Sequence, residues 1–520
     1  MTLRPCAALL AFAATAHAEP ILTSWFTQNS GVLARSIQSS TLTTPVTMWP
    51  ASGVANNNTG GVAQTVPVYA DIQRIRHTPT DVYINASGLA SYTMGPWLSA
   101  SGGLFGFWPL ANDYQVRITR APTQTTAKTK HPGGPIGMMV NGVVIYDLGD
   151  SFSFKQSNTT TPSTSAAVTG SDAMGFTAPW SRDALAVEVV TFDPGFAHQP
   201  GNNGQYHYHA QPKALRHQLG DNTKASYNAA TNTYSYAEDT SNLHHSPILG
   251  WCYDGYPIYG PYGYSVASDP SSPVTRMRTG FQIRDGSRGT TNLATTGRIS
   301  LPRWAATAQG YANPSNLVSV PLAATEYGPT IDYKSTGPGA ATYSLGRYIG
   351  DYEYLGDRGY LQGTDFDLDQ YNGRQCVTPD FPGGTYAYFV AIDSLGSTTF
   401  PHMLSKEFYG VKNAGTSTSV PANAVDIFNG GPNLQETMRP PTVNSSSGTV
   451  TIAWNSVEGG TYKLEAADEP GGAWTVLNPA VPAAANTTRT AVTETSSGPK
   501  RFYRVTRTAT APYDPAFVGQ

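Results

Sequence analysis

The segment that decides the fold is Gly137-Met-Met-Val-Asn-Gly-Val-Val-Ile-Tyr146, in which Asn141-Gly142 separates two apolar runs. An Asn-Gly pair between hydrophobic runs indicates a β-hairpin, because both residues tolerate the positive φ angles of a two-residue turn. Other segments alternate in polarity or are rich in β-branched residues, and we predict strands there: 81–85, 114–119, 184–191 and 385–392. The best helix candidate is short, near residues 181–185. The sequence therefore predicts a mainly β protein.

The composition agrees with this fold class and excludes others. Only 13% of the 520 residues are Asp, Glu, Lys or Arg, whereas Gly and Pro number 52 and 39. Such a composition is typical of short strands joined by many turns, and the hydrophobic content of 39% is enough for a sizeable core. The formal net charge of −3 argues against a nucleic-acid-binding protein, which would carry a basic patch.

The first 18 residues have the pattern of a signal peptide. A mostly apolar stretch ends in Ala16-His17-Ala18, a small-x-small cleavage pattern followed by Glu19. We therefore expect an exported protein, secreted or periplasmic. Neither this stretch nor any later one is long enough to span a membrane as a helix. Residues 19–64 are rich in Ser, Thr and Asn and are expected to form an irregular N-terminal arm.

Export changes what the cysteines suggest. Cys252 and Cys376 remain after removal of the leader. In an oxidising compartment a single pair of cysteines favours a disulfide, and we expect one here. The alternative is that one or both thiols bind a metal ion.

The C-terminal part of the chain differs from the rest in its composition and in the spacing of its strands. Residues 413–441 are rich in Gly, Pro, Asn and Ser and are predicted as a linker. Between 442 and 507, alternating strands recur at short spacing, which indicates a small β-sandwich. This segment resembles a fibronectin type III module with Trp454 in an early strand. The expected architecture is a large irregular β domain, residues 65–412, followed by this small sandwich.

The strongest chemical feature is Gln205-Tyr-His-Tyr-His-Ala210. On a strand, His207 and His209 project from one face, and Tyr206 and Tyr208 from the other. Two imidazoles two residues apart can bind one metal ion. Six of the ten histidines fall between residues 198 and 245, which strengthens the case for a site.

Several ordered motifs resemble the YHYH-domain family of secreted proteins. They include 137–146, 180–184, 192–198, 204–212, 245–264, 368–374, 378–390 and 408–410, and together they cover roughly residues 65–412. The resemblance supports the domain assignment. It implies little about a reaction, because the family looks defined by its motif.

We predict a transition-metal site, copper or zinc, centred on His207 and His209. His198 lies before a Gly/Asn-rich turn that could fold it back, and His245 follows just before an apolar strand, so both are predicted as further ligands. The candidates for the wall of the site are Tyr206, Tyr208, Asp254 and Tyr256. A buried His/Tyr hydrogen-bond network without metal is the competing interpretation.

Two other functions stay open. The tyrosines at 253, 256, 259, 262 and 264 would suit an aromatic platform in a glycan-binding or cell-surface module. A hydrolase could use His207 or His209 as general base, oriented by Asp254. The sequence contains no GxSxG, HExxH or Walker motif, so it supports no serine hydrolase of that kind and no nucleotide enzyme.

Overall fold

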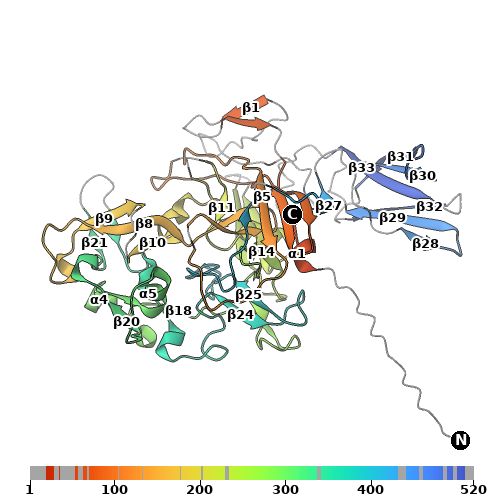
Figure 1. The fold of residues 1–520 in the computed structure, drawn as a ribbon. Helices are drawn as coiled ribbons and strands as arrows, with labels where there is room; N and C mark the ends of the chain where they lie inside the picture. Colours follow the sequence, from red (N-terminus) through yellow and green to blue (C-terminus); the bar gives the residue numbers. More distant parts are fainter. Residues whose placement is uncertain are drawn as a thin grey trace, which may run out of the picture.

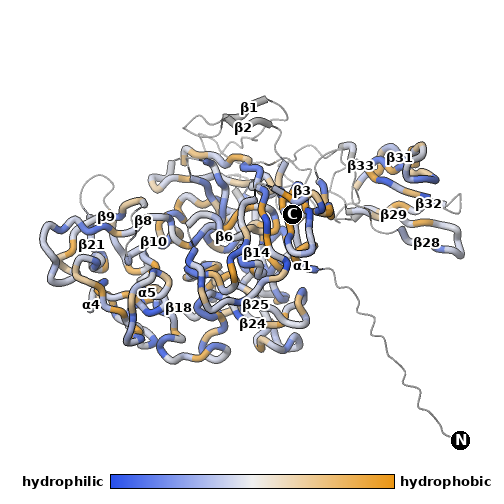
Figure 2. The backbone as a smooth tube through the Cα atoms, viewed as in Figure 1, coloured by the Kyte–Doolittle hydropathy of each residue, from blue (hydrophilic) through white to orange (hydrophobic). Residues whose placement is uncertain are grey.

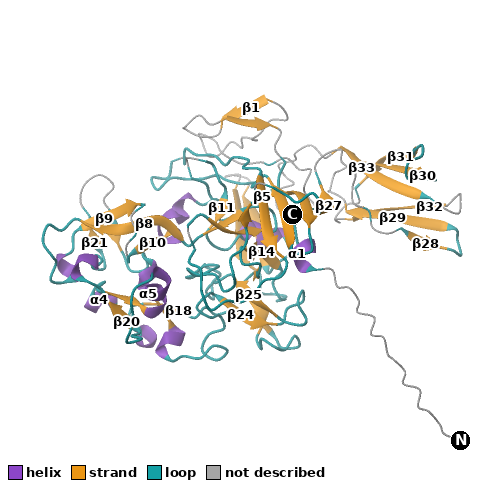
Figure 3. Cartoon of the chain, in the orientation of Figure 1, coloured by secondary structure: helices purple, strands orange, loops and turns teal. Residues whose placement is uncertain are grey.

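The computed structural model is mainly β, as predicted, with short helices set among many loops (Figures 1 and 3). It describes residues 19–27, 34, 53–56, 63–66, 69–103, 105–131, 133–175, 177, 179–200, 203–228, 233–335, 341–417, 419–430, 438, 441–455, 461–483, 489–495 and 501–509. The predicted signal peptide, residues 1–18, lies outside this part of the chain, as does most of the predicted arm. None of the described helices is long and apolar enough to cross a membrane.

A mixed seven-stranded sheet forms the centre of the protein. Its strand order is β11 (His207–Tyr208), β7 (Val144–Tyr146), β6 (Pro135–Met139), β14 (Ile248–Cys252), β15 (Pro257–Tyr259), β25 (Thr385–Phe389) and β24 (Gly373–Cys376). The predicted hairpin is confirmed as β6 and β7. Strand β11 is parallel to β7, and His207 pairs with Val144 and Tyr208 with Ile145.

A five-stranded antiparallel sheet packs against the same core. Its order is β26 (Gly415–Thr416), β5 (Tyr114–Thr119), β4 (Asp81–Ala86), β3 (Ile72–His77) and β27 (Val425–Asn429). Apolar side chains of both sheets belong to one buried cluster, which includes Ile84, Val116, Val144 and Trp251. Figure 2 shows hydrophobic segments along the central strands, around β14. Strands β26 and β27 come from the stretch predicted as a linker.

Smaller elements surround the two main sheets. A three-stranded sheet is formed by β10 (Ser181–Asp183), β8 (Gly149–Gln156) and β9 (Gly170–Met174). Two-stranded ribbons pair β1 (Gly53–Asn56) with β2 (Ala63–Val66), β12 (Thr223–Asn228) with β13 (Thr233–Glu238), β16 (Tyr262–Tyr264) with β17 (Val274–Arg276), β18 (Phe281–Ile283) with β23 (Tyr352–Tyr354), β19 (Ser300–Pro302) with β20 (Ser319–Pro321), and β21 (Tyr333–Lys334) with β22 (Thr342–Tyr343). The α-helices are α1 (Pro20–Thr23), α2 (Ala184–Glu188), α3 (Lys213–Gln218), α4 (Leu293–Thr296) and α5 (Arg303–Gln309).

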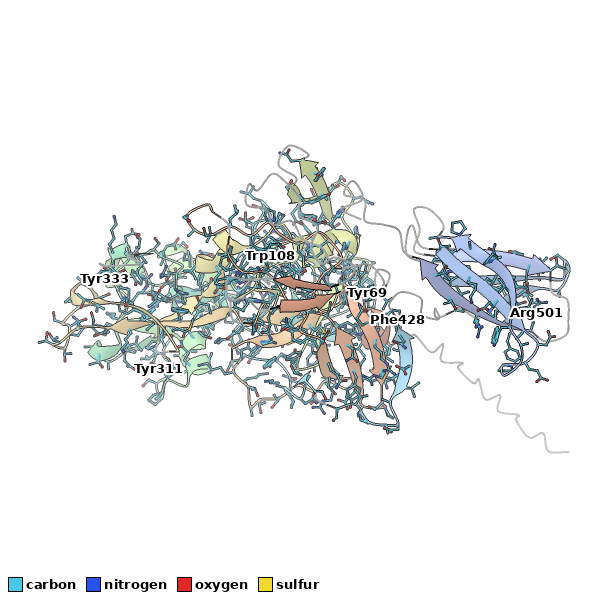
Figure 4. All side chains as sticks on the ribbon, turned by 90° about the horizontal axis from the view of Figure 1, so that it is seen from above. Tyr69, Trp108, Tyr311, Tyr333, Phe428 and Arg501 are labelled. Atoms are coloured by element: carbon cyan, nitrogen blue, oxygen red, sulfur yellow. The ribbon has the colours of Figure 1, made fainter. Side chains whose placement is uncertain are left out.

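The C-terminal strands form a small β-sandwich, in agreement with the expected fold class. One sheet has the order β28 (Thr442–Asn444), β29 (Thr449–Asn455), β32 (Arg489–Thr495), and the other β31 (Thr475–Pro482), β30 (Thr461–Ala467), β33 (Phe502–Ala509). Trp454 and Tyr462 are fully buried in the cluster that these strands share. Figures 1 and 4 place the sandwich, marked by Arg501, at one end of the molecule.

The strand predicted over 184–191 is wrong. Residues Ala184–Glu188 form helix α2, and Val189–Thr191 continue as a single 3-10 turn, η2. The cause is local, because the Asp183 carboxylate accepts a hydrogen bond from the Leu185 N–H and caps the first turn of the helix. The cap overrides the strand preference of the valines that follow.

The expected disulfide is also wrong. Cys252 and Cys376 are both free thiols, and both are buried. Cys252 lies in β14 and Cys376 in β24, with β15 and β25 between them. Strands β14 and β24 are thus three strand spacings, or about 14 Å, apart. A disulfide needs its two Cα atoms within about 7 Å of each other.

The hairpin turn should be intolerant of a side chain at Gly142. This residue has a φ of +82°, and a Cβ atom there would meet the Cβ of Ala86 at 2.4 Å. We expect Gly142→Ala to lower the free energy of unfolding by about 3 kcal/mol or more, from backbone strain plus the clash. Urea denaturation monitored by tryptophan fluorescence measures this change.

The matched control is Gly134→Ala, since Gly134 also has a positive φ, +65°, but open space around it. It should lose only the backbone contribution, about 1–2 kcal/mol. Equal losses in the two variants would contradict the packing of the hairpin turn against β4.

Candidate metal centre

Four ligand-type side chains converge beside β11. Glu188, His198, His207 and His209 each offer one atom, and these atoms all lie within 4.8 Å of one another. The Nε2 atoms of His207 and His209 are 2.9 Å apart. Glu188 Oε2 lies 3.3 Å from His198 Nε2 and 3.2 Å from His209 Nε2. The structure thus brings together three of the four predicted ligands and adds Glu188.

The strand geometry explains how His207 and His209 meet. Successive side chains of β11 point to opposite faces, so both imidazoles lie on one side and Tyr206 and Tyr208 on the other. His198 joins them because its backbone pairs with that of His207 through two hydrogen bonds, of 3.2 and 2.9 Å. The turn between residues 198 and 207 folds back as the sequence predicts.

Hydrogen bonds fix the tautomer of two imidazoles directly. His207 Nδ1 lies 2.7 Å from the carbonyl oxygen of Gln205, and His209 Nδ1 lies 2.8 Å from that of Asp147. A carbonyl oxygen only accepts, so both Nδ1 atoms carry the proton and donate it. In the neutral imidazoles the Nε2 atoms are therefore bare lone pairs that face the centre.

His198 follows the same rule through a hydroxyl group. Thr191 Oγ1 donates to the backbone carbonyl of Glu188 at 2.7 Å, and it lies 2.6 Å from His198 Nδ1. Because the hydroxyl proton is already used, Thr191 accepts from the Nδ1–H of His198. Its Nε2 also faces the centre without a proton.

The group could hold a metal ion, because its ligand-type atoms face one another at short range. Three lone pairs and a carboxylate repel one another at these separations unless a proton or a metal ion lies among them. Glu188 Oε2 is buried and has no hydrogen-bond partner with acceptable geometry. A metal ion would satisfy all four atoms, whereas one proton satisfies at most two.

Burial and mutual contacts shift the pKa values of the four side chains when no metal is bound. Burial opposes ionisation of Glu188, but its contacts with His198 and His209 outweigh burial and hold its pKa well below the usual range. Burial also disfavours a charged His209, yet Glu188 raises its pKa overall. Burial and the neighbouring imidazoles lower the pKa of His207. Without metal, His209 is therefore the one histidine of the group whose charged form is favoured over its usual range, and His207 the one whose charged form is most disfavoured.

Aromatic rings shield the site from water. The ring of Tyr146 stacks on His207 with centroids 3.8 Å apart, and Phe192 lies against His198 at 4.6 Å. The three histidines are at most 6% exposed. The Glu188 side chain is 27% exposed as a whole, although its Oε2 atom, which faces the histidines, is buried.

The other predicted residues lie elsewhere. His245 is not part of the group: it precedes β14, which is three strand spacings or about 14 Å from β11 in the sheet. Its Nδ1 contacts the Ser246 carbonyl, and its ring packs on Tyr259 and Tyr264. The wall residue Tyr256 packs on Tyr386 and Tyr409 instead.

Asp254 does not orient either histidine of the pair. Its carboxylate accepts hydrogen bonds from Tyr388 Oη at 2.6 Å and from the backbone N–H groups of Gly410 and Tyr256 at 2.9 and 3.2 Å. The Nδ1 atoms of His207 and His209 are bound to backbone carbonyls. The Asp–His pair of the hydrolase alternative is therefore not formed in the described structure.

The tyrosines of the motif form a separate buried network behind the strand. Tyr92 Oη lies 2.9 Å from Tyr206 Oη and 2.5 Å from Tyr208 Oη, and Tyr206 donates to Asp193 at 2.6 Å. Burial raises the pKa of Asp193 to about 6, although Tyr206 and the N–H groups of Gly95 and Ala197 bind its carboxylate. The network anchors the back of β11.

Glu188 is the ligand that sequence reasoning missed. The sequence pattern predicts a strand at this position, and no motif marks a glutamate there. The available signal was Asp183 directly before Ala-Leu-Ala-Val-Glu188, since an aspartate ahead of helix-forming residues is typical of an N-cap.

The fold and the site define a mainly β protein with a buried cluster of three histidines and one glutamate. Comparison with family models then gives a match to "YHYH protein" over residues 115–398. The chain belongs to the YHYH family, as the motifs suggested. No curated protein and no solved structure matches it.

Asp193 should make stability fall as the pH rises. Its folded pKa lies above the value of about 3.9 expected in the unfolded chain, so between pH 4 and 6 the folded state binds more protons. Relative to wild type, Asp193→Asn should gain about 2 kcal/mol between pH 4 and 7. Urea denaturation across this range measures the difference.

The control is Asp113→Asn, since Asp113 is exposed and also has a positive φ, 45°, which asparagine tolerates. Its stability difference from wild type should be the same at pH 4 and pH 7. A flat profile for Asp193→Asn as well would show that the buried network keeps this carboxylate ionised.

Proposed function

We propose that the YHYH domain binds one transition-metal ion, zinc or copper, through Glu188, His198, His207 and His209. The observation that carries the proposal is the set of hydrogen bonds on the far side of each imidazole. They fix three Nδ1–H tautomers, so that three Nε2 lone pairs and a carboxylate face one point. Metal-binding histidines in proteins are held by this kind of outer hydrogen bond.

The dimensions of the group fit such an ion. Zinc bound to nitrogen or carboxylate oxygen at 2.0–2.1 Å implies tetrahedral edges of about 3.3 Å. Three of the six separations in the group, 2.9, 3.2 and 3.3 Å, lie within a few tenths of this value, and the others are at most 4.8 Å. Imidazole-rich sets with one oxygen suit zinc and copper. Bound zinc would supply a Lewis acid, and bound copper an electron-transfer centre as well.

The role of the protein's own residues follows from the geometry. The four side chains hold the ion, and Tyr146 and Phe192 exclude water from the histidine side. Glu188 is the most exposed of the four side chains, although its Oε2 atom is buried. These features support a site whose ion is largely shielded from solvent.

Elemental analysis by mass spectrometry tests the proposal. Protein purified without a histidine tag should carry about one equivalent of zinc or copper. His207→Ala/His209→Ala should lose it, and Glu188→Gln should bind the ion at least about tenfold more weakly because a charged ligand is gone. His245→Ala is the matched control, since His245 is also buried in the same domain but lies outside the group, and it should keep the metal.

A wild-type protein that takes up no ion, even after incubation with zinc and copper, would overturn the proposal. The cluster would then be a buried hydrogen-bond network without metal.

Metal affinity should fall on acidification. The ion competes with a proton for His209, because Glu188 raises the pKa of this imidazole. Below that pKa, each unit of pH should weaken binding about tenfold. Competition with a chromophoric chelator between pH 5 and 8 measures the slope, and a pH-independent affinity would contradict binding through deprotonated His209.

Glycan binding by the tyrosine-rich segment is the weaker candidate. Tyr253, Tyr256, Tyr259 and Tyr262 are 3%, 8%, 0% and 4% exposed, which leaves their faces covered. An aromatic platform for sugars needs open ring faces.

For the whole protein we also propose export, on the basis of the leader at residues 1–18. For the C-terminal sandwich we propose a role as a fibronectin type III-like spacer or attachment module.

A further inference from the structure

Two buried aspartates support the metal centre from behind. Asp183 caps helix α2, accepting the Leu185 N–H at 3.0 Å, and Glu188 is the last residue of that helix. The backbone carbonyl of Asp147 holds His209 by its Nδ1–H at 2.8 Å. The two aspartates lie on adjoining segments, because the Ala184 N–H donates to the Leu148 carbonyl at 2.8 Å.

Both carboxylates are bound by one distant loop. His402 Nε2 lies 3.1 and 3.0 Å from the two carboxylate oxygens of Asp183. Lys406 Nζ forms an ion pair with Asp147 Oδ2. All four side chains are at most 9% exposed. The loop itself is anchored by backbone hydrogen bonds, from the Ala391 N–H to the His402 carbonyl and from the His131 N–H to the Lys406 carbonyl.

Each contact reaches a different ligand of the metal centre. Helix α2 has five residues, so its cap is a large part of what keeps it helical and keeps Glu188 in place. Asp147 positions His209 through its backbone, and its carboxylate is held by Lys406, with His131 Nδ1 3.7 Å from the other oxygen. The loop therefore acts on the oxygen ligand Glu188 through His402, and on the nitrogen ligand His209 through Lys406.

We propose that His402 and Lys406 are positioning residues of the metal centre, and we call residues 402–406 the basic clamp. The proposal rests on the proposed metal binding. The basic clamp sets the positions of Glu188 and His209 before the ion arrives, so the ion meets a formed set of ligands. Outer residues of this kind typically change metal affinity 10- to 100-fold when they are removed.

The test compares removing and conservative variants. His402→Leu removes the N–H donor, and His402→Gln keeps one; Lys406→Met removes the charge, and Lys406→Arg keeps it. Arg303→Met is the control, because Arg303 pairs with Asp357 at 3.3 Å in the same domain but contacts neither aspartate of the metal centre. Thermal melting of all five variants reports their global stability.

Two readouts separate positioning from general stability. In metal-free protein, hydrogen exchange by mass spectrometry follows residues 184–191 and 205–210. In protein loaded with cobalt(II), the visible absorption bands and a chelator competition report ligand geometry and affinity. We expect His402→Leu to speed hydrogen exchange at 184–191 about tenfold or more, because the helix cap is lost. Lys406→Met should speed exchange at 205–210 to a similar extent. Both variants should bind cobalt about 10- to 100-fold more weakly.

The conservative variants and the control complete the expectation. His402→Gln and Lys406→Arg should retain most of the wild-type spectrum and affinity, and Arg303→Met should lower the melting temperature without changing either readout at the site. The proposal would be overturned if His402→Leu and Lys406→Met lost stability as the control does but left hydrogen exchange at both segments and the cobalt spectrum unchanged.

Failure of the proposed metal binding gives a different result. Wild-type protein would then bind no cobalt, zinc or copper. Hydrogen exchange in the metal-free variants would still decide whether His402 and Lys406 hold helix α2 and the segment 205–210, since that measurement needs no ion.

Discussion

The parallel pairing of β11 with β7 is the interaction on which the rest of the site depends. Two residue pairs form it, His207 opposite Val144 and Tyr208 opposite Ile145. A shift of one residue would exchange the faces of the strand and send the tyrosines to the metal side. The register is held from both sides, because the buried Tyr92–Tyr206–Tyr208 network lies behind the strand and the Gln205 and Asp147 carbonyls hold the imidazoles in front.

The chemistry of the site is set by the direction of these hydrogen bonds more than by the presence of histidine. Each imidazole donates its Nδ1–H outward, which leaves its basic nitrogen pointing inward. A buried histidine that serves packing alone has no need for its lone pair to meet two others and a carboxylate. His245 illustrates the contrast, since it is equally buried and donates its Nδ1–H, but its neighbours are tyrosine rings.

Local patterns predicted the parts of this structure that depend on neighbours in sequence. The Asn141-Gly142 hairpin, the alternation of His and Tyr on β11 and the return of His198 follow from turn chemistry and strand period. The failures have two causes. Glu188 depends on a helix created by the local Asp183 cap, which overrides the strand preference of the valines. The placing of His245, Cys252 and Cys376 depends on strand order, which only the assembled sheet determines.

This protein has few charged residues, yet it buries several of them in pairs. Such pairs can fix the positions of the short strands and loops that form the site. Such elements fix little by themselves: β11 has two residues and α2 five. Buried ion pairs contribute little net stability after desolvation, but they are directional and strongly penalise a lost partner. The hydrogen bond of His402 to Asp183 and the ion pair of Lys406 with Asp147 join segments 219 and 259 residues apart. The YHYH motif therefore supplies two ligands, and long-range contacts of buried aspartates determine where the other elements of the centre must lie.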